Sequence, residues 1–262
     1  MRLNKYIAHN SKYSRREADK LIEEGKVKIN RAYVKDFGYK VQKDDVVYVN
    51  GKEIKPKGKY DVTMIVYNKP KGSLVTKKDD RGRTTIYHLL PGKFRHFIPV
   101  GRLDFASEGL LLLTDNSYIA TLLMKSDLPR VYNIKIDKML TQEMIDAMQN
   151  GLVLEDASKG AYENSEIKSM EFAPFVGFVV KSEGKNYTKL KVAIKEGKNR
   201  ELRRFFGHFD AKVLDLKRVS YGPFELNNLP ENKTRFLTKK EYEILHKLIK
   251  EEEKRDNKRV NN

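Results

Sequence analysis

The chain has no cysteine among its 262 residues. This absence excludes disulfide frameworks and thiolate metal sites, and it fits a protein of a reducing compartment. Long hydrophobic runs are absent as well: the N-terminal segment lacks the apolar core of a secretory signal, and no later stretch approaches the roughly 20 apolar residues of a membrane span. The sequence therefore predicts a soluble protein of the cytoplasm.

Clusters of metal ligands and nucleotide-binding fingerprints are also missing. The five histidines are scattered along the chain, and the two aspartate pairs, at residues 44–45 and 79–80, lie in polar segments typical of turns. Neither arrangement has the ligand spacing of a metal site. No glycine-rich stretch follows a strand with the spacing of a P-loop or a dinucleotide fingerprint. A metal-dependent nuclease or phosphotransferase is therefore disfavoured, and we expect neither a metal nor a nucleotide cofactor.

Positive charge is what the sequence has in excess. Its 53 lysines and arginines stand against 36 aspartates and glutamates, which leaves a formal charge of +17. Such a field attracts polyanions and steers their approach, so nucleic acid is the leading partner. An anionic membrane surface is the competing partner, but we find neither a long basic amphipathic helix nor a lipidation signal.

Residues 1–50 are expected to form a small domain of two short helices and a hairpin-like pair of strands. Ser14 and Glu17 have the spacing of a capping box, an apolar stripe follows them, and Gly25 supplies the stop, so this stretch predicts a helix. The other face of that helix is basic. Its candidate RNA-binding cations are Lys12, Arg15, Arg16 and Lys20.

A lysine-rich segment with two glycines and one proline, residues 51–60, is expected to link two domains. Residues 61–240 mix short half-polar strands with helices in no regular order, which favours an α+β domain with a mostly antiparallel mixed sheet flanked by helices and loops. Residues 241–262 are expected to form a C-terminal helix and a charged, frayed tail. The helices of this part are expected near residues 117–125, 141–150, 199–207 and 239–254.

Asp104 stands out because of its flanks. It lies between FIPV and LLLLT, two apolar runs of strand length, so the residues between them are expected to form a rigid loop joining two buried strands. Arg102 or another nearby cation could keep its carboxylate ionised. A positioned anionic oxygen is what a nucleophile or a general base requires. From these residues alone, an aspartate that caps a turn remains the alternative.

The segment around Asp104, VGRLDFASEGLLLLTDN, resembles the signature of the RsuA/RluB/RluE/RluF family of ribosomal RNA pseudouridine synthases. Four further segments resemble family segments in the expected order: YNKPKGSLVT, DRGRTTIYHLLP, EGKNRELRRFF and LKRVSYGPFELNNLP. The resemblance covers nearly all of residues 60–240. The basic N-terminal unit resembles the ribosomal-protein-S-four-like RNA-binding module that this family often carries in front.

The resemblance implies that Asp104 is the catalytic aspartate, acting on the target uridine as a nucleophile or as a base toward the ribose. The sequence does not choose between these routes. In both, the bond from base to sugar breaks, the uracil turns, and its C5 bonds to the sugar carbon, without a cofactor or a metal.

The same resemblance assigns roles to two further residues. Tyr132 matches the tyrosine that packs against the target base, although without the resemblance a core aromatic on an alternating strand is the simpler interpretation. Arg203 matches the arginine that pairs with the aspartate. The expected RNA contacts of this part of the chain are Arg102, Lys198, Arg200 and Arg204. The chain departs from frequent family residues at Ser117, where glycine is common, and at Glu201, where glutamine is common.

The expected substrate is a uridine of ribosomal RNA. The motifs resemble those of the RluB-like branch more closely, which favours the large subunit. The RNA is either free or part of a subunit assembly intermediate. Extruding a stacked uridine costs a few kcal/mol, which phosphate contacts must offset. The alternative is a non-catalytic RNA-binding or ribosome-assembly protein, which has no need of Asp104, Tyr132 and Arg203 together. Nothing in the sequence demands more than a monomer.

Overall fold

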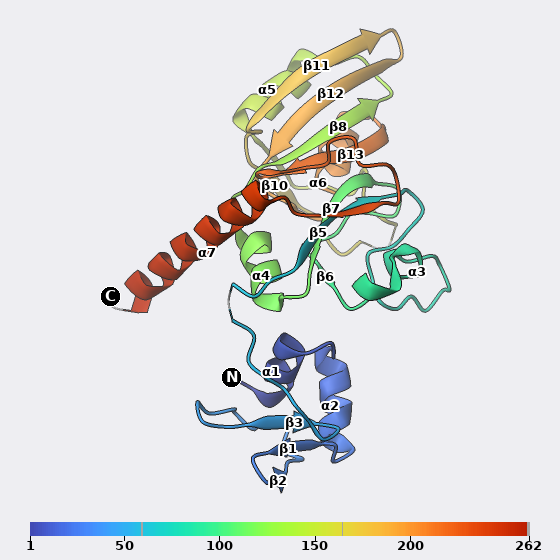
Figure 1. Ribbon diagram of the computed structural model, residues 1–262. Helices are drawn as coiled ribbons and strands as arrows, with labels where there is room; N and C mark the ends of the chain where they lie inside the picture. Colours follow the sequence, from blue (N-terminus) through green and yellow to red (C-terminus); the bar gives the residue numbers. More distant parts are fainter. Residues whose placement is uncertain (59, 164, 261–262) are drawn as a thin grey trace.

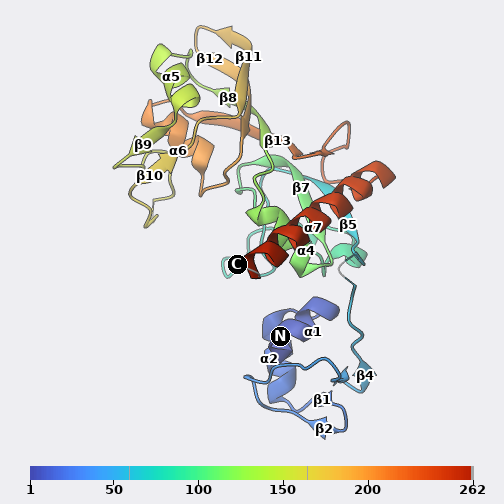
Figure 2. The ribbon, with the colours of Figure 1, turned by 90° about the vertical axis from the view of Figure 1, so that its left-hand side faces the viewer.

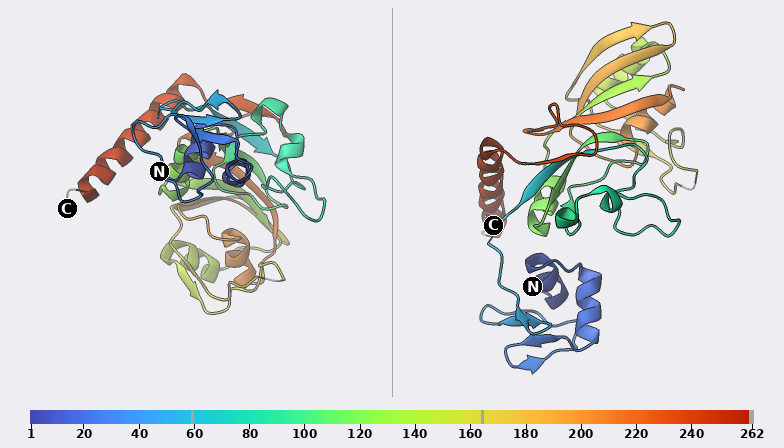
Figure 3. Two further views of the ribbon diagram at one scale, coloured as in Figure 1. Left: turned by 90° about the horizontal axis from the view of Figure 1, so that it is seen from below. Right: turned by 45° about the vertical axis from the view of Figure 1, so that its right-hand side comes forward.

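The computed structural model describes residues 1–58, 60–163 and 165–260. A small N-terminal domain is joined by an extended segment to a larger domain built on one twisted sheet (Figure 1). The right-hand view of Figure 3 shows the N-terminal domain below the sheet, joined to it by an extended segment.

Two helices, α1 (Leu3–Asn10) and α2 (Arg15–Glu23), share one buried apolar cluster with the sheet of the N-terminal domain. Within residues 1–58 this sheet has four antiparallel strands in the order β2–β1–β3–β4. The strands are β1 (Val27–Ile29), β2 (Ala32–Tyr33), β3 (Val47–Val49) and β4 (Lys52–Glu53).

The helix predicted after Ser14 is confirmed with its cap. The Glu17 backbone N–H donates to Ser14 Oγ at 3.2 Å, and the Ser14 N–H donates to Glu17 Oε2 at 2.6 Å, which completes the capping box. Gly25 follows the helix at φ +67°, a conformation that glycine adopts without cost. Ala18 and Ile22 are fully buried, so the apolar stripe packs as expected.

The stretch expected to be a linker contributes a strand. Lys52 and Glu53 form β4, which pairs with β3, so the N-terminal sheet extends into the range predicted as a connection. The reason is local, because Asn50 and Gly51 both adopt positive φ and close a tight hairpin there. Further along, the segment contacts the larger domain, where Lys57 Nζ lies 3.1 Å from Asp115 Oδ2.

The sheet of the larger domain has nine strands among the described residues, and its one parallel strand pair is β13 with β7. The predicted α+β domain with a mostly antiparallel mixed sheet is thus confirmed. In spatial order the strands are β11 (Gly177–Gly184), β12 (Tyr187–Ile194), β8 (Arg130–Ile136), β13 (Val213–Tyr221), β7 (Glu108–Thr114), β5 (Met64–Lys69) and β15 (Thr234–Phe236), with β14 (Phe224–Glu225) beside β13 and β6 (Ile98–Pro99) beside β7.

The leucine run of β7 is apolar throughout because both of its faces are covered. Leu111 and Leu113 belong to one buried cluster, and Leu110 and Leu112 belong to another. Successive side chains of a strand point to opposite faces, so an uninterrupted apolar run is what a doubly covered strand requires.

Helices cover these two faces at different places. The first cluster includes residues of α3 (Ile86–Leu89), a 3-10 helix (Gly92–Phe94), α5 (Gln142–Asn150) and α6 (Glu201–His208), together with the small two-stranded sheet β9 (Leu152–Leu154) and β10 (Met170–Phe172). The second includes residues of α4 (Ser117–Lys125) and α7 (Lys239–Val260), which lie beside each other (Figure 2). The helices predicted near 117–125, 141–150, 199–207 and 239–254 are all present.

The expectation of a frayed C-terminal tail is wrong for the described part of the chain. α7 continues to Val260, because the charged ending contains no glycine or proline and is rich in strong helix formers. Residues 261–262 lie outside the described residues. No helix over 1–58, 60–163 or 165–260 combines the length and the apolar character that crossing a bilayer demands.

Candidate active site

Asp104 lies in the loop between β6 and β7, where the sequence predicts it. The expectation that both flanking strands are buried holds for β7 only. Ile98 and Pro99 of β6 are half-buried, because β6 is two residues long and pairs only with the last residues of β7. The loop is therefore held chiefly by β7 and by contacts to its backbone.

Lys69 supplies the main backbone contacts. Its buried ammonium group donates to the carbonyl oxygens of Pro70, Asp104 and Ser107 at 3.0, 3.2 and 2.8 Å. Burial lowers the pKa of Lys69 to about 8, although the charges of Asp104 and Glu108 act in the opposite direction. The ammonium group thus joins the carbonyl of Pro70, which follows β5, to two carbonyls of the Asp104 loop, and it fixes the backbone of Asp104 in place.

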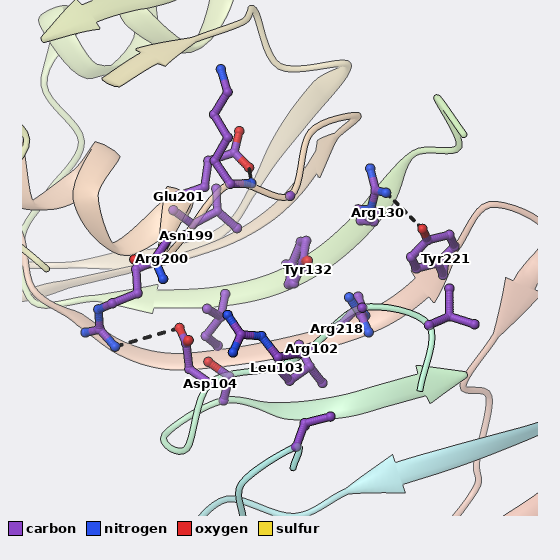
Figure 4. A pocket seen from close by; sticks show the side chains of 18 of the residues that line it. Arg102, Leu103, Asp104, Arg130, Tyr132, Asn199, Arg200, Glu201, Arg218 and Tyr221 are labelled. Carbon is purple, nitrogen blue, oxygen red and sulfur yellow. Dashed lines mark hydrogen bonds and ion pairs between the residues drawn. The ribbon is translucent and has the colours of Figure 1, made fainter. Parts of the chain in front are cut away.

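Two arginines flank the Asp104 carboxylate. Arg200 Nη1 lies 3.7 Å from Asp104 Oδ2 (Figure 4), and Arg203 Nε lies 4.0 Å from the same oxygen. The side chain of Asp104 is 25% exposed, whereas those of Arg200 and Arg203 are only 14% and 10% exposed. The ion pairs are therefore shielded from bulk water, which strengthens them relative to a surface pair. Arg203, expected to pair with Asp104, does contact it, and Arg200, expected at a phosphate, lies closer.

Arg203 also connects the Asp104 loop to the sheet. Its Nη1 donates to the Val213 carbonyl at 2.9 Å, and its Nη2 donates to the Ala106 carbonyl at 3.1 Å. Because Val213 begins β13 and Ala106 belongs to the loop, one planar guanidinium holds both against Asp104.

Arg200 has an unusual backbone. Its φ of +50° lies in the left-handed region, which is costly for a side chain other than glycine, asparagine or aspartate. The guanidinium is positioned from two other sides: Nε donates to the Gly160 carbonyl at 2.6 Å, and Cζ lies 4.2 Å from the ring centroid of Tyr162. The surrounding structure therefore fixes Arg200 in a conformation that brings it to Asp104.

Asp104 and Tyr132 line one cavity of about 570 Å³, a size typical of small-molecule sites. Tyr132 lies on β8 with only 7% of its surface exposed, and the apolar side chains of Leu103 and Leu216 complete the wall beside it. Figure 4 shows Asp104 at one end of this cavity and Tyr132 along its side. The lining thus combines an anionic oxygen, an aromatic ring and an apolar floor.

Two buried arginines line the same cavity, and sequence reasoning missed both. Arg130 donates to the Tyr221 hydroxyl at 2.8 Å, and Arg218 Nε donates to the Leu110 carbonyl at 2.7 Å. Nη2 of Arg218 is buried and has no hydrogen-bond partner within the described residues. Alternation along β13 is the pattern that could have indicated Arg218, because it lies two residues after the buried Leu216 and therefore shares its face of the strand.

The other predicted cations are distributed over two places. Arg102 and Lys198 are exposed and belong to the lining of the cavity, with Lys198 Nζ 2.9 Å from Glu196 Oε2. The cations predicted on α2 and just before its cap are exposed as expected, but they lie on the N-terminal domain and do not line the cavity; these are Lys12, Arg15, Arg16 and Lys20.

The prediction that Arg204 contacts RNA is wrong, because its side chain is fully buried. Nε donates to the Asn199 carbonyl at 3.1 Å, Nη1 to the carbonyls of Ala157 and Ile167, and Nη2 to Ser165 Oγ at 2.6 Å. Arg204 therefore fastens the segment after β9 to α6. It points inward because neighbouring residues of a helix project about 100° apart, so Arg203 and Arg204 cannot face the same side.

Glu201 is a further residue of the lining that the sequence marked only as a departure from glutamine. It is 6% exposed and its Oε2 accepts the Lys198 backbone N–H at 2.9 Å. Burial raises the pKa of Glu201 to about 7. The cavity wall thus contains a carboxyl group that titrates near neutral pH.

Over the residues that the structure describes, no three or more histidine, cysteine, aspartate or glutamate side chains cluster so that they could hold a metal ion.

Comparison with known proteins identifies the family of the chain. A family model described as RNA pseudouridylate synthase matches residues 63–208, and an S4 domain model matches residues 1–47. An uncharacterised RNA pseudouridine synthase of Helicobacter pylori is 52% identical over 246 residues, which cover 94% of each chain.

Two relatives with more specific names are similar over most of their length. The ribosomal large subunit pseudouridine synthase B of Bacillus subtilis is 33% identical and covers 94% of this chain and 96% of the relative. The dual-specificity RNA pseudouridine synthase RluF of Escherichia coli is 34% identical, covering 95% of this chain and 79% of the relative. A crystal structure of a pseudouridylate synthase has the same fold, with a TM-score of 0.61 over 94% of this chain and 99% of that chain at 24% identity. The chain therefore belongs to the RsuA/RluB/RluF family of RNA pseudouridine synthases, with an S4 domain in front of the synthase domain.

Proposed function

We propose that this synthase converts one specific uridine of large-subunit ribosomal RNA into pseudouridine, and that Asp104 carries the reaction. The observation that carries the proposal is the position of the Asp104 carboxylate, which lies at the wall of a cavity beside Tyr132 and within 4.0 Å of two arginines. A base extruded from RNA needs such a pocket, because the reaction cannot take place inside a stacked helix.

The chemistry of Asp104 has two balanced routes. As a nucleophile, the carboxylate bonds to C1′ while the bond from C1′ to uracil N1 breaks, and C5 of the turned base later displaces it. As a base, it takes a proton from the ribose while the uracil leaves, and it returns that proton when C5 has bonded to C1′. In both routes C5 loses its proton and N1 gains one, so the product is an isomer and no cofactor is consumed.

The surrounding side chains suit these steps. Arg200 and Arg203 lie opposite the charge of the carboxylate and restrict its rotamers. The ring of Tyr132 lies on the wall, where an extruded uracil would stack against it, and its phenol is a candidate to assist the loss of the C5 proton. A base that stacks against an aromatic ring on one face can still turn in its own plane, which is one way to bring C5 to C1′.

RNA would be held outside the cavity by exposed cations. Arg102 and Lys198 lie at its rim, and the basic face of α2 supplies a second group on the N-terminal domain. Phosphate contacts of this kind offset the cost of extruding the uridine and make binding fall steeply with salt.

The assignment to the large subunit follows the name of the Bacillus subtilis relative, and either the free RNA or an assembly intermediate would serve as substrate in the cytoplasm. The experiment maps pseudouridines across both ribosomal RNAs of cells that lack the protein. Wild type, Asp104→Asn and the control Asp127→Asn, an exposed aspartate outside the cavity, are then supplied in turn. We expect one or a few sites to disappear, to return with wild type and the control, and to stay absent with Asp104→Asn.

The isomerisation rate measured with Asp104→Asn should fall by at least about 1,000-fold, since removal of a catalytic carboxylate commonly has that effect. If no pseudouridine is lost from either RNA while purified protein still binds RNA, the chain is a non-catalytic RNA-binding or assembly protein and the proposal is rejected.

A further inference from the structure

A second cavity, of about 400 Å³, adjoins the first and shares Arg200 with it. It is formed by the loop around Gly160, by α6 and by the start of β13. Arg203, which contacts Asp104 from behind the first cavity, lines this second one. The two arginines beside the catalytic carboxylate therefore form a common wall between two spaces.

The second cavity is strongly cationic. Lys159, Arg200, Arg203 and Lys212 contribute to its lining, against a single carboxylate, Asp210. That carboxylate is neutralised by Lys159, whose Nζ lies 2.6 Å from Asp210 Oδ1. The ammonium group of Lys212 has no ion pair within the described residues and its side chain is exposed. The surplus of positive charge suits an anionic group such as a phosphate.

The wall of this cavity is closely packed at two glycines. A Cβ atom on Gly160 would lie 2.1 Å from the Arg203 carbonyl oxygen, and one on Gly207 would lie 3.0 Å from the Lys159 carbonyl. The loop around Gly160 therefore lies directly on α6 with no side chain between them. This contact holds the backbone of Lys159 and Gly160 against the helix that carries Arg203.

An exposed aromatic ring lies beside the shared wall. Tyr162 is 50% exposed, although its ring lies over the Arg200 guanidinium. A half-exposed ring beside an arginine is a surface on which an unpaired base can stack. The left-handed backbone of Arg200 is part of this arrangement, because it holds the guanidinium between Tyr162 and Asp104.

We propose that the second cavity binds the phosphodiester group adjacent to the extruded uridine, and that Tyr162 stacks with the neighbouring base. The proposal rests on the proposed function, since it takes the uridine to occupy the first cavity. Arg200 lines both cavities. An RNA strand whose extruded nucleotide occupies the first cavity would therefore bring its next phosphate to the second. Free phosphate shares the same chemistry, and the experiments separate the two sources.

The first experiment uses the absence of cysteine. Lys212→Cys introduces a single thiol into the full-length chain, and a photoactivatable azidophenacyl group attached to it reports which nucleotides lie at the second cavity. The probe is ribosomal RNA purified from cells that lack the protein. The matched control is Lys185→Cys in the turn between β11 and β12, outside both cavities.

We expect crosslinks from residue 212 to concentrate within about two nucleotides of the modified uridine, and crosslinks from residue 185 to lie elsewhere or to be scattered. If a uridine is modified but the crosslinks from residue 212 match those of the control, this inference is wrong while the proposed function stands. If no uridine is modified and the crosslinks still concentrate at one place, the proposed function fails while the second cavity remains an RNA site.

The second experiment measures affinity. Lys212→Glu should raise the dissociation constant for the same RNA about tenfold. It should also lower the slope of the logarithm of affinity against the logarithm of salt concentration by about one, as loss of a phosphate contact does. Lys185→Glu should change the dissociation constant less than twofold. Equal effects of the two variants, both shown to be folded by circular dichroism, would contradict the proposal. The same binding assay is repeated with inorganic phosphate in place of chloride at constant ionic strength. If wild type keeps its RNA affinity there and Lys212→Glu no longer binds more weakly than wild type, the cavity binds free phosphate and the proposal is contradicted.

Tyr162 has its own test. Tyr162→Ala should weaken RNA binding about tenfold, whereas Tyr162→Phe should retain it, because stacking requires the ring and not the hydroxyl. If the two variants bind RNA equally well, stacking at Tyr162 is excluded.

Discussion

The basic residues of α2 and those of α6 have the same chemistry but different surroundings. On α2, Arg15, Arg16 and Lys20 are exposed to water. On α6, Arg203 has a side chain that is 10% exposed and Arg204 is fully buried. The comparison shows that a basic stretch in this protein has two uses, long-range attraction where it is solvated and local positioning where it is buried.

The difference has an energetic reason. An exposed cation interacts through a high dielectric that salt screens, so each one contributes little and many act together. A buried guanidinium contributes through fixed hydrogen bonds to specific carbonyls, and its removal leaves those carbonyls without donors. Single substitutions should therefore be severe at α6 and mild at α2.

The largest of these effects on folding is expected at Arg204. Arg204→Met keeps much of the side-chain volume but removes the donors to the carbonyls of Ala157, Ile167 and Asn199. We expect the free energy of unfolding to fall by about 3 kcal/mol, and the melting temperature by about 10 °C, because several buried acceptors lose their partners. Thermal unfolding followed by circular dichroism measures it.

Arg16→Met on α2 is the matched control for that experiment. Its side chain is exposed, so the same change should alter the stability by no more than about 0.5 kcal/mol. Comparable losses at both positions would mean that burial does not distinguish the two helices.

An intermediate effect, with a dependence on pH, is expected at Glu201. Its carboxyl titrates at 4.5 when exposed, whereas burial in the folded protein raises its pKa to about 7. Between these values the folded state binds more protons than the unfolded state, so this group makes stability fall as the pH rises from 4.5 to 7. Glu201→Gln removes the titration and can still accept the Lys198 N–H, so it should stabilise the protein by about 2 to 3 kcal/mol above pH 7.

Urea unfolding at pH 5 and pH 8 measures this difference. The gain should be small at pH 5 and large at pH 8, whereas Glu143→Gln, an exposed carboxylate at the start of α5, should show no such dependence. A gain that is the same at both pH values would show that the buried carboxyl does not titrate in this range.

The smallest effect is expected on α2 itself. Arg16→Gln should weaken binding to ribosomal RNA only about two- to fivefold and lower the salt slope by about one, to a similar extent for any RNA sequence. Filter binding at several salt concentrations measures both quantities. Glu23→Gln on the same helix should not weaken binding, and a sequence-dependent loss with Arg16→Gln would indicate a base contact instead of a phosphate contact.

Much of the fold could be inferred from short-range patterns. The capping box of α2, the helices near residues 117–125 and 141–150, and the loop that holds Asp104 all depend on residues a few positions apart. The expectation of a frayed tail was wrong for the described residues. The ending lacks apolar anchors, but its helix propensity is high and α7 continues to Val260.

The candidate site was harder to infer in its details. Asp104, Tyr132 and Arg203 were identified through a resemblance of whole motifs, and the structure brings Asp104 and Tyr132 to one cavity with Arg203 beside it. Arg130 and Arg218 were missed because alternation shows only which residues share a face of a strand, whereas the partner strands decide that this face lies beside the cavity.

Composition and local spacing were sufficient to establish a basic, cysteine-free chain with a capped helix, an α+β domain and an aspartate in a rigid loop. They could not say which of the consecutive residues Arg203 and Arg204 faces Asp104 and which is buried. That outcome depends on how α6 packs against the start of β13, which follows it in the chain, and against the Gly160 loop, which lies about 40 residues before it. Burial and charge pairing arise from such tertiary contacts, so the same residue type lies beside the Asp104 carboxylate at 203 and fastens a loop at 204.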